Sequence, residues 1–593
     1  MNVPTFASRA RTSFPVALFL VSVIGLFGPI HIYLTNIMEF SFAFTQALGV
    51  LVLLLVAAVA IADFLLAVLP AGGHLFVRGT AFACALGLAF WIQGNILVWR
   101  YGLMDGKDVD WAAKAVYGWI DTPVWLVLLG SAVARPGWWT RHAVKISLMF
   151  VVIQLVSALP LLGKAKEAGS FKMYSASEEG VHQFSRKTNV VVLIFDTFQN
   201  DVFQEILEKA PSYAEGFDGF TYFRNTLGGY PTTYGSISYL LTGRFYENQE
   251  PVQAFLKEAF LSPCSIPKVL MDNGFRVDLY PGPEKTVYFS PETLSNLADP
   301  PGVTLRDVAY LYGLTLFRYV PHFLKRHVHG CREWVFHASH PPPPVALQTG
   351  TPPPGIRKES MFPEEAMQSS DVRFMSDLLG RAAAVTDKNV FKFYHRFSPH
   401  PPIVLDEHMN YGRRPFNRSN YVEFAMSTLK MAQAFLDALR KLDVYEDSLV
   451  IIMGDHGYSD PGLGVRPPGG VADEDRGGAD VPIHVRGSAL PLLLVKPIGA
   501  TGALRTSDAP VSLGDIPATI FSELGISADC PGRRIFDVEE TARRTRRFLH
   551  YSWTHATWKH EYFPDMTEYE VTGFAWDAAS WRPTGRTFVA PAR

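Results

Sequence analysis

Three short segments of this chain carry side chains that suit metal-dependent chemistry. Asp196 comes directly after NVVVLIF, and Asp455 and His456 follow LVIIM within the motif GDHG. Carboxylate oxygens and imidazole nitrogens are suitable ligands for Zn²⁺ or Mn²⁺. An Asp-His pair after an apolar run is a weak signal when taken alone, so the interpretation depends on the third segment.

The third segment, GGYPTTYGSISYLLTGR at 228–244, joins a Gly/Pro turn and a cluster of hydroxyl side chains to an apolar stretch typical of a helix. A hydroxyl at such a turn meets the positive end of the helix dipole, which favours an alkoxide and a bound anion. Serine and threonine also cap helices here, and capping alone would explain the segment if it stood by itself.

The apolar runs before these residues predict the elements that position them. NVVVLIF at 189–195 is typical of a buried parallel strand, and similar runs recur at 390–394, 448–453 and 490–495. Residues 421–442 have the apolar spacing of a helix. This alternation predicts an α/β domain with a mostly parallel central sheet and helices on both faces, with active residues at the carboxyl ends of the strands.

Charge is distributed unevenly along the 593 residues. The formal net charge of -2 excludes a nucleic-acid binder that depends on bulk basic charge. The mean hydropathy of +0.10 is high for a soluble enzyme. Because residues 1–165 contain only 16 of the 110 charged side chains, the apolar excess is N-terminal. The sequence therefore predicts a membrane domain followed by a water-facing domain.

Five apolar runs approach the roughly 20 residues needed to cross a bilayer. They are 15–34, 45–70, 80–99, 115–134 and 143–162. The fourth carries Asp121, so a re-entrant or interfacial segment is its alternative. The first is interpreted as a retained helix, since further spans follow it. Basic residues are concentrated on one side: Arg9, Arg11, Arg78, Arg135, Arg141 and Lys145.

This charge bias predicts a cytoplasmic N-terminus in a bacterial inner membrane, with everything after the fifth span in the periplasm. The predicted organisation is a transmembrane domain at 1–165, a connector at 166–188, a catalytic domain at 189–530 and a C-terminal extension at 531–593. A Pro-rich insertion is predicted at about 336–365.

Two further features are left open by the sequence. The stretch Arg306–Trp334 is interpreted as an ordinary amphipathic core helix, with a helix on the membrane surface as the alternative. Cys264, Cys331 and Cys530 allow at most one disulfide in the outer domain, and its pairing is undetermined.

The combined motifs resemble the sulfatase-like branch of the alkaline phosphatase superfamily over about residues 189–526. In sulfatases a nucleophile turn leads into a helix that ends in LLTGR, and LLTGR at 240–244 places Thr233 at the nucleophile position. In phosphoethanolamine transferases the nucleophilic Thr is followed by hydroxyl residues three and nine positions later, as Ser236 and Thr242 follow Thr233. Five spans before such a domain also resemble these transferases and the lipoteichoic acid synthases.

The resemblance implies roles for individual residues. Asp196, Thr233, Asp455 and His456 would hold a divalent metal, with Zn or Mn favoured. Thr233 would be the nucleophile, and His395 and His400 would flank the phosphoryl site, with His400 protonating the leaving group. His484 is either a further ligand or a plain loop residue. Because position 233 is Thr rather than Cys, the formylglycine of ordinary sulfatases cannot form.

The resemblance thus favours a phosphotransferase over a sulfuric ester hydrolase. The expected reaction transfers a phospholipid-derived head group to an envelope glycan or lipid acceptor through a phospho-threonine intermediate. Two alternatives are retained: a membrane-anchored sulfatase- or phosphatase-type ester hydrolase, and a catalytically silent membrane regulator. No nucleic-acid partner is expected.

Overall fold

The computed structural model contains two compact units. The first comprises residues 1–173 and 299–346, and the second comprises 174–298 and 347–593. The structure describes residues 5–36, 40, 42–70, 74–101, 109, 111–167, 174–281, 286–298, 302–330, 333–334, 362–470, 481–552 and 562–591.

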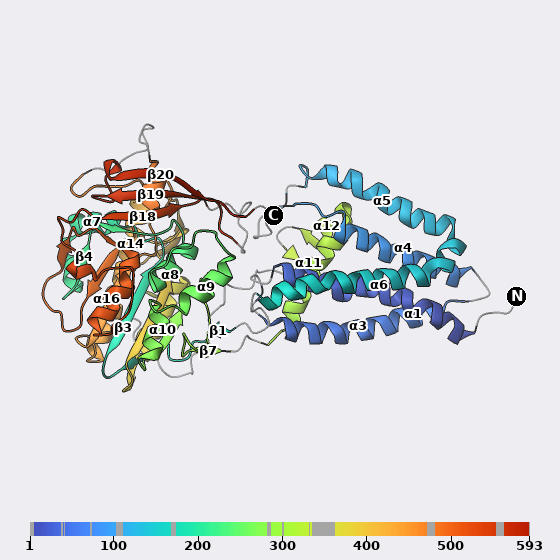
Figure 1. Cartoon of the computed structure of the whole chain (residues 1–593), viewed down its shortest axis with the longest axis horizontal. Coiled ribbons are helices and arrows are strands. Elements are labelled where there is room, and N and C mark those ends of the chain that lie inside the picture. The colour runs from blue at the N-terminus through green and yellow to red at the C-terminus, as the bar shows by residue number, and fades with distance from the viewer. Residues whose placement is uncertain are drawn as a thin grey trace. The chain divides into compact units, whose positions relative to one another are not determined.

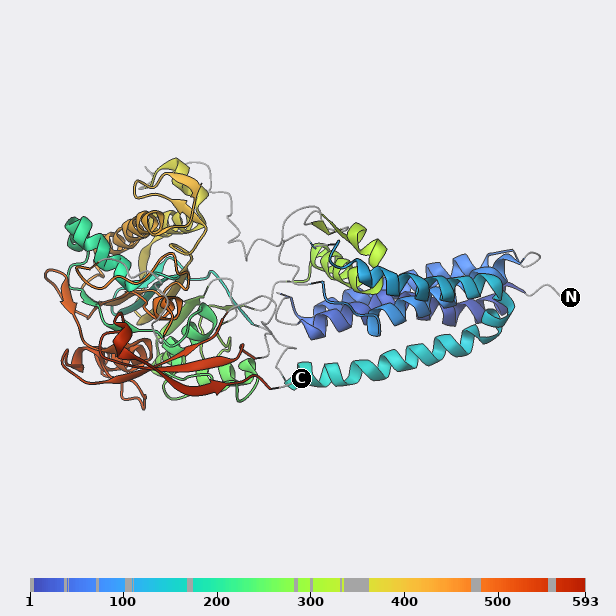
Figure 2. The same cartoon turned by 90° about the horizontal axis from the view of Figure 1, so that it is seen from above.

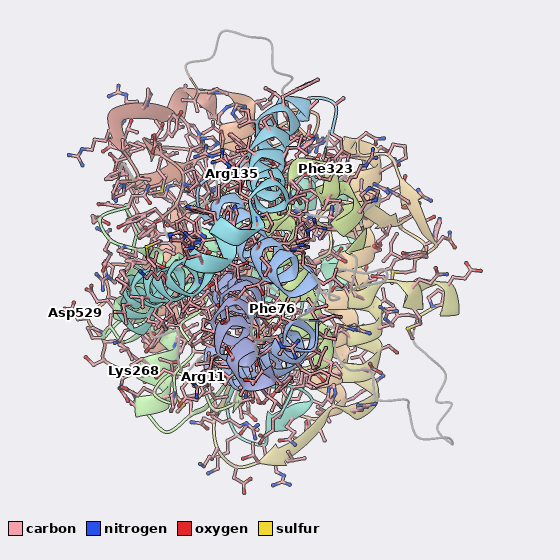
Figure 3. The ribbon with its side chains drawn as sticks, turned by 90° about the vertical axis from the view of Figure 1, so that its right-hand side faces the viewer. Arg11, Phe76, Arg135, Lys268, Phe323 and Asp529 are labelled. Carbon is pink, nitrogen blue, oxygen red and sulfur yellow. A yellow bond between two sulfur atoms is a disulfide. The ribbon has the colours of Figure 1, made fainter. Side chains whose placement is uncertain are left out.

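Five helical segments of the first unit are long and apolar enough to cross a membrane (Figure 1, Figure 2). The first segment is continuous from Phe6 to Thr35 and contains α1 (Phe6–Ser22), a π-helical turn (Val23–Phe27) and α2 (Gly28–Thr35). The others are α3 (Phe44–Ala67), α4 (Leu75–Asn95), α5 (Ala115–Ala134) and α6 (Pro136–Glu167). The prediction of five apolar N-terminal helices is confirmed. Figure 3 looks onto the end of this unit where Arg11 and Arg135 lie.

Asp121 is completely buried in α5, and its carboxylate is satisfied by two hydrogen bonds. The indole Nε1 of Trp99 donates to Oδ1 over 2.6 Å, and the backbone N–H of His322 donates to Oδ2 over 2.9 Å. A buried carboxylate without partners would strongly destabilise an apolar bundle. The one acidic residue in this predicted span is therefore compatible with a helix of this length and composition.

A segment from the middle of the chain completes the first unit. The helix α11 (Leu305–Tyr319) is followed by α12 (His322–Val328) and by the short pair β8 (His329–Gly330) and β9 (Glu333–Trp334). The Tyr312 hydroxyl donates to the carbonyl of Gly25 over 2.9 Å, and Arg318 Nε donates to the carbonyl of Gly94 over 2.8 Å. The helix is amphipathic, but it packs on apolar helices of the first unit rather than on the sheet of the second.

The second unit is built on a seven-stranded sheet with the order β16-β4-β15-β14-β3-β11-β6. Pairing directions make β15 antiparallel to the other six strands. The predicted α/β fold with a mostly parallel sheet is confirmed. The strands are β3 (Asn189–Phe195), β4 (Thr221–Phe223), β6 (Arg276–Tyr280), β11 (Val390–Arg396), β14 (Ser448–Met453), β15 (Leu493–Lys496) and β16 (Arg505–Ser507).

Alternate residues of β3 enter two separate apolar cores, because successive side chains of a strand point to opposite faces. Val190, Val192 and Ile194 pack on one face, and Val191, Leu193 and Phe195 on the other. The first core includes side chains of α8 (Thr233–Thr242), α9 (Val252–Phe260), α10 (Ile266–Asp272) and α16 (Ile516–Glu523). The second includes those of α7 (Asn200–Lys209), α13 (Ser370–Arg381) and α14 (Arg418–Lys441).

Smaller elements surround this core. A three-stranded antiparallel sheet near the C-terminus consists of β18 (Thr545–His550), β19 (Met566–Thr572) and β20 (Trp581–Phe588) (Figure 1). Two-stranded pairs join β1 (Ser175–Ala176) to β7 (Leu297–Ala298), β2 (Gln183–Ser185) to β10 (Ala383–Thr386), β5 (Thr226–Leu227) to β17 (Val511–Ser512), and β12 (Ile403–Leu405) to β13 (Tyr411–Arg414).

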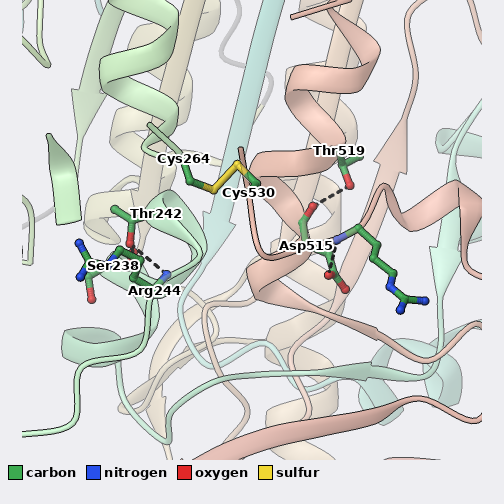
Figure 4. The surroundings of a disulfide bond; sticks show 8 residues. Ser238, Thr242, Arg244, Cys264, Asp515, Thr519 and Cys530 are labelled. Atoms are coloured by element: carbon green, nitrogen blue, oxygen red, sulfur yellow. Dashed lines mark hydrogen bonds between the residues drawn. A yellow bond between two sulfur atoms is a disulfide. The ribbon is translucent and has the colours of Figure 1, made fainter. Parts of the chain in front are cut away.

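A disulfide between Cys264 and Cys530 joins the turn before α10 to the segment after α16 (Figure 4). Cys331 and most of the predicted Pro-rich insertion, including the prolines at 341–344 and 352–354, lie outside the described residues, as do residues 168–173 of the predicted connector. The disulfide closes a loop of 266 residues across one core of the second unit.

We expect the double variant C264A/C530A to lower the free energy of unfolding of the second unit by about 2–5 kcal/mol, because cross-links of long loops restrict the unfolded chain. Denaturant unfolding of the detergent-solubilised full-length protein measures this loss. A reducing agent should destabilise the wild type and leave the double variant unaffected. Free thiols at both positions in alkylated, non-reduced protein would contradict the pairing.

Candidate metal centre

Three neighbouring strands end at the same edge of the large sheet and carry the acidic and imidazole side chains there. Asp196 directly follows β3, and Asp455 and His456 follow β14. His395 lies near the end of β11 and pairs in register with Ile194 of β3, as Met453 of β14 also does. The parallel register therefore brings these four residues together from segments about 60 to 260 residues apart.

The ligand atoms of this group lie close together. One atom each from Asp196, His395 and Asp455 falls within 4.8 Å of the other two. His456 Nε2 lies 3.6 Å from Asp196 Oδ1 and 3.5 Å from Asp455 Oδ2. The four side chains are at most 8% exposed. Such a buried group of nitrogen and oxygen atoms has the composition of a transition-metal site.

Two members of this group leave polar atoms unsatisfied. Among the residues that the structure describes, neither Asp455 Oδ2 nor the two ring nitrogens of His395 have a hydrogen-bond partner. His395 Nε2 is 3.6 Å from Asp455 Oδ2, which is too long for a hydrogen bond. Burying a carboxylate oxygen without a partner is costly, and a cation between these atoms would remove that cost. The residues present therefore fit a divalent metal.

The surroundings of Asp455 favour its ionised form. Burial by itself would raise the pKa of this carboxyl, but the neighbouring imidazoles of His456 and His395 hold the pKa below its usual value. The other oxygen, Oδ1, accepts hydrogen bonds from the backbone N–H groups of Thr197 (3.1 Å) and His456 (3.0 Å). These two bonds orient the carboxylate with Oδ2 toward the imidazoles of His395 and His456.

The Thr197 donor depends on an unusual backbone conformation. Thr197 has a φ of 61°, in the left-handed region that a β-branched residue rarely adopts. The hydroxyl of Tyr421, on α14, donates to the Thr197 carbonyl over 2.7 Å and fixes this turn. Backbone strain of this kind persists only where the surrounding structure maintains it, and it is concentrated at functional sites.

The two glycines of GDHG are required by close backbone approach. A Cβ at Gly454 would lie 2.5 Å from the Phe198 carbonyl, and one at Gly457 would lie 1.9 Å from the Gly487 carbonyl. His456 Nδ1 donates to the Gly457 carbonyl over 2.6 Å. Because a carbonyl oxygen only accepts, this bond places the proton on Nδ1 and leaves the lone pair of Nε2 available to a metal.

Thr233 and Thr232 have different surroundings. Thr233 is the first residue of α8, and its Oγ1 lies 3.4 Å from His456 Nε2. Thr232 precedes the helix, and its hydroxyl contacts the Tyr551 hydroxyl at 2.5 Å. Thr233 is thus the hydroxyl that faces the proposed metal ligands. The hydroxyls of Ser236 and Thr242 donate to backbone carbonyls and serve the local structure.

Tyr551 contacts the turn beside the candidate centre, and no sequence expectation includes it. It follows β18, whose Leu549 N–H donates to the Gly229 carbonyl over 2.9 Å, so the C-terminal sheet braces the turn that carries Thr232 and Thr233. No sequence motif marks Tyr551, because its contact with Thr232 spans 319 positions.

The two predicted phosphoryl-site histidines take up different positions. His395 lies within the carboxylate–imidazole group. His400 donates from Nδ1 to the Pro401 carbonyl over 2.6 Å, which leaves Nε2 as its available atom. Burial lowers the pKa of His400; the Pro401 bond opposes this shift, whereas the nearby charge of His456 adds to it. The assigned roles of Thr233, His395 and His400 remain predictions.

His484 lies in α15 (Ile483–Ser488), and its ring centroid is 5.7 Å from that of His550. Burial, together with the charge of His484, lowers the pKa of His550 to about 4. Within the described part of the chain, the group of possible metal ligands contains Asp196, His395 and Asp455, and it includes neither His484 nor the predicted ligand His456. The further-ligand role of His484 also remains a prediction.

Comparison with known proteins gives one family. The family model described as Sulfatase matches residues 188–526. A search of curated proteins finds no match.

The solved structures similar to this chain include the following three. The phosphonate monoester hydrolase of Silicibacter pomeroyi is 13% identical, with 67% of this chain and 88% of that chain covered and a TM-score of 0.37. The putative sulfatase yidJ of Bacteroides fragilis is 11% identical, with 65% and 86% covered and a TM-score of 0.36. The C-terminal periplasmic domain of EcEptC from Escherichia coli, in complex with Zn, is 11% identical, with 64% and 92% covered and a TM-score of 0.32.

We expect Asp455→Asn and His456→Gln each to weaken metal binding by more than about 100-fold, since substitution even of residues behind the ligands typically weakens it 10–100-fold. Elemental analysis of full-length protein purified without chelators measures metal per chain. Glu258→Gln, an exposed carboxylate paired with Arg244, is the matched control and should retain the metal. Equal metal content in the wild type and Asp455→Asn would show that the group does not bind it.

Proposed function

The chain belongs to the sulfatase family, and we propose that within this family it is a membrane-anchored phosphotransferase. The proposed reaction moves a phospholipid-derived phosphoryl head group to an envelope glycan or lipid acceptor through a phospho-threonine intermediate. The observation that carries the proposal is the position of Thr233 Oγ1, 3.4 Å from His456 Nε2 at the candidate metal centre.

The residue type at position 233 favours phosphoryl chemistry. A threonine cannot be converted to the formylglycine aldehyde that ordinary sulfatases use, so the attacking group is a hydroxyl. A free threonine hydroxyl is a weak nucleophile at neutral pH and needs activation. Thr233 has two sources of activation: the ligand group beside it and the N-terminus of α8, whose dipole favours negative charge.

Asp196, Asp455 and His456 are the proposed metal ligands beside Thr233, and His395 lies within reach of the same centre. A bound Zn²⁺ or Mn²⁺ would lower the pKa of the threonine hydroxyl and neutralise charge on the phosphoryl oxygens. The fixed Nδ1–H of His456 and the two backbone donors to Asp455 keep these ligands oriented.

In the proposed first step, Thr233 Oγ attacks the phosphorus of the head group. A new Oγ–P bond forms, the bond from phosphorus to the lipid oxygen breaks, and the threonine proton leaves to solvent. His400 Nε2 donates a proton to the departing lipid oxygen. In the second step an acceptor hydroxyl attacks the same phosphorus: the bond from the acceptor oxygen to phosphorus forms, the Oγ–P bond breaks, the acceptor proton passes to His400 Nε2, and Thr233 Oγ regains a proton from solvent.

The membrane unit supports a lipid donor. Five spans tether the catalytic unit to a bilayer, which raises the effective concentration of lipid substrates. Basic residues are concentrated at the end of the first unit that carries the N-terminus of the chain, and this bias supports a cytoplasmic N-terminus. With an odd number of spans, the catalytic unit is then periplasmic, in the inner membrane of a bacterium.

An ester hydrolase is the second candidate, and the match to the sulfatase family favours it. Water would then release the group from Thr233 in place of an acceptor. Supplying labelled phospholipid together with envelope glycan separates the two: transfer to the glycan supports the transferase, and free head group supports the hydrolase.

We expect Thr233→Ala to abolish both turnover and a covalent phosphoryl adduct, with a loss of rate of at least about 1,000-fold, as for other nucleophile deletions. Intact-protein mass spectrometry after exposure to phospholipid vesicles measures the adduct. Thr232→Ala is the control, because its hydroxyl contacts Tyr551 rather than the centre, and it should keep the adduct. An adduct that persists in Thr233→Ala would assign the nucleophile elsewhere.

We expect the titration of His400 to determine how the rate changes with pH. Its pKa is lowered from 6.5 chiefly by burial, so the protonated, proton-donating form is lost as pH rises through this lowered pKa. Activity should therefore decline on the alkaline side, and His400→Gln should have a lower rate without this decline. His408→Gln, an exposed histidine, is the control. Identical profiles for the wild type and His400→Gln would remove His400 from the mechanism.

A further inference from the structure

An open cavity of about 360 Å³ lies at one end of the first unit, where the N-terminal turns of three helices meet. Ser8 and Arg9 contribute from α1, Phe76 and Val77 from α4, and Gly137 and Arg141 from α6. Its size lies within the roughly 300–1,000 Å³ typical of ligand pockets. Figure 3 looks onto this end of the unit, with Phe76 labelled between Arg11 and Arg135.

The lining of this cavity is suited to an anion. Arg9 donates from Nη1 to the Leu69 carbonyl over 2.5 Å, while its buried Nε has no hydrogen-bond partner among the residues that the structure describes. Arg141 is exposed and adds a second guanidinium. An arginine presents its donors in a planar fork that matches phosphate oxygens.

The surroundings add positive potential and little negative charge. α1, α4 and α6 all begin at the cavity, so the positive ends of three helix dipoles are directed toward it. Residues 1–12, 67–80 and 130–147 contain no aspartate or glutamate. Asp63, on α3, does not line the cavity; its carboxylate accepts a hydrogen bond from Ser13, one turn along α1 from Arg9.

The same cavity has apolar walls. Phe76 and Val77 line it, and the helices continue from it into membrane-spanning apolar segments. A free phosphate ion gains nothing from such walls, whereas a phospholipid places its phosphodiester among the arginines and its chains along the helices. Basic pockets between transmembrane helices bind acidic lipid head groups in this way.

We propose that this cavity binds the phosphodiester head group of an anionic phospholipid. Because five spans separate the N-terminus from the catalytic unit, the lipid belongs to the leaflet opposite the one that supplies the proposed substrate. The site is thus distinct from the candidate metal centre and does not depend on the reaction performed there.

The test measures lipid binding to full-length protein in a neutral detergent by native mass spectrometry. Dioctanoyl phosphatidylglycerol should bind at one saturable site, more tightly than dioctanoyl phosphatidylcholine, whose cationic choline is repelled by the two arginines. The double variant R9Q/R141Q should bind phosphatidylglycerol roughly tenfold to thirtyfold more weakly, given about 1 kcal/mol for each basic residue near an anionic lipid.

The matched control is R78Q/R135Q, which removes two exposed arginines from the same end that do not line the cavity. It changes the net charge equally and should bind phosphatidylglycerol within twofold of the wild type. R9K/R141K keeps the two positive charges that favour the orientation of the helices in the membrane, but it loses the planar guanidinium groups. It should bind phosphatidylglycerol several-fold more weakly than the wild type.

Three results would overturn the proposal. Equal losses in R9Q/R141Q and R78Q/R135Q would assign the binding to general positive charge. Equal affinity for phosphatidylglycerol and phosphatidylcholine would exclude an anionic head-group site. Binding of glycerol phosphate as tight as that of phosphatidylglycerol would exclude a lipid ligand.

Discussion

Two buried carboxylates, Asp196 and Asp455, face each other at the edge of one sheet, and the second unit is organised around their compensation. Like charges in a protein interior are tolerated only when a cation or a dense set of hydrogen bonds neutralises them. Within the described ranges, Asp455 takes two backbone N–H donors on one oxygen and none on the other, and neither ring nitrogen of His395 has a hydrogen-bond partner. The strained Thr197 turn and the crowded glycines of GDHG are best understood as the structural cost of this arrangement.

The sequence predicted this edge of the sheet because each part of it is local. An unbroken apolar run indicates a buried strand, and the polar residue after it must emerge at the strand's carboxyl end. Parallel pairing of these strands then places Asp196, His395, Asp455 and His456 at the same edge of the sheet, so no other sequence signal is needed to predict that they lie together. The choice of Thr233 over Thr232 came from motif spacing, and the contact with His456 is consistent with it.

Contacts between distant segments without a periodic pattern were beyond prediction. The Cys264–Cys530 pairing depends on how α10 and α16 approach across one core, and three cysteines leave it undetermined. Tyr551 reaches the turn that carries Thr232 and Thr233 because Leu549 of β18 donates to the Gly229 carbonyl. The surface on which α11 packs could not be predicted either, since an amphipathic pattern indicates an apolar face but not the surface that covers it.

The return of α11 to the apolar helices means that the first unit is not contiguous in sequence. In a cell, the ribosome completes all five spans well before it makes residues 305–319. The first unit therefore stays incomplete while residues 174–298 of the second unit emerge. A fragment that begins after residue 173 would not be water-soluble, because the apolar face of α11 would lose the helices that cover it. A soluble form requires a second excision, at 299–346, and a linker that joins the flanking ends.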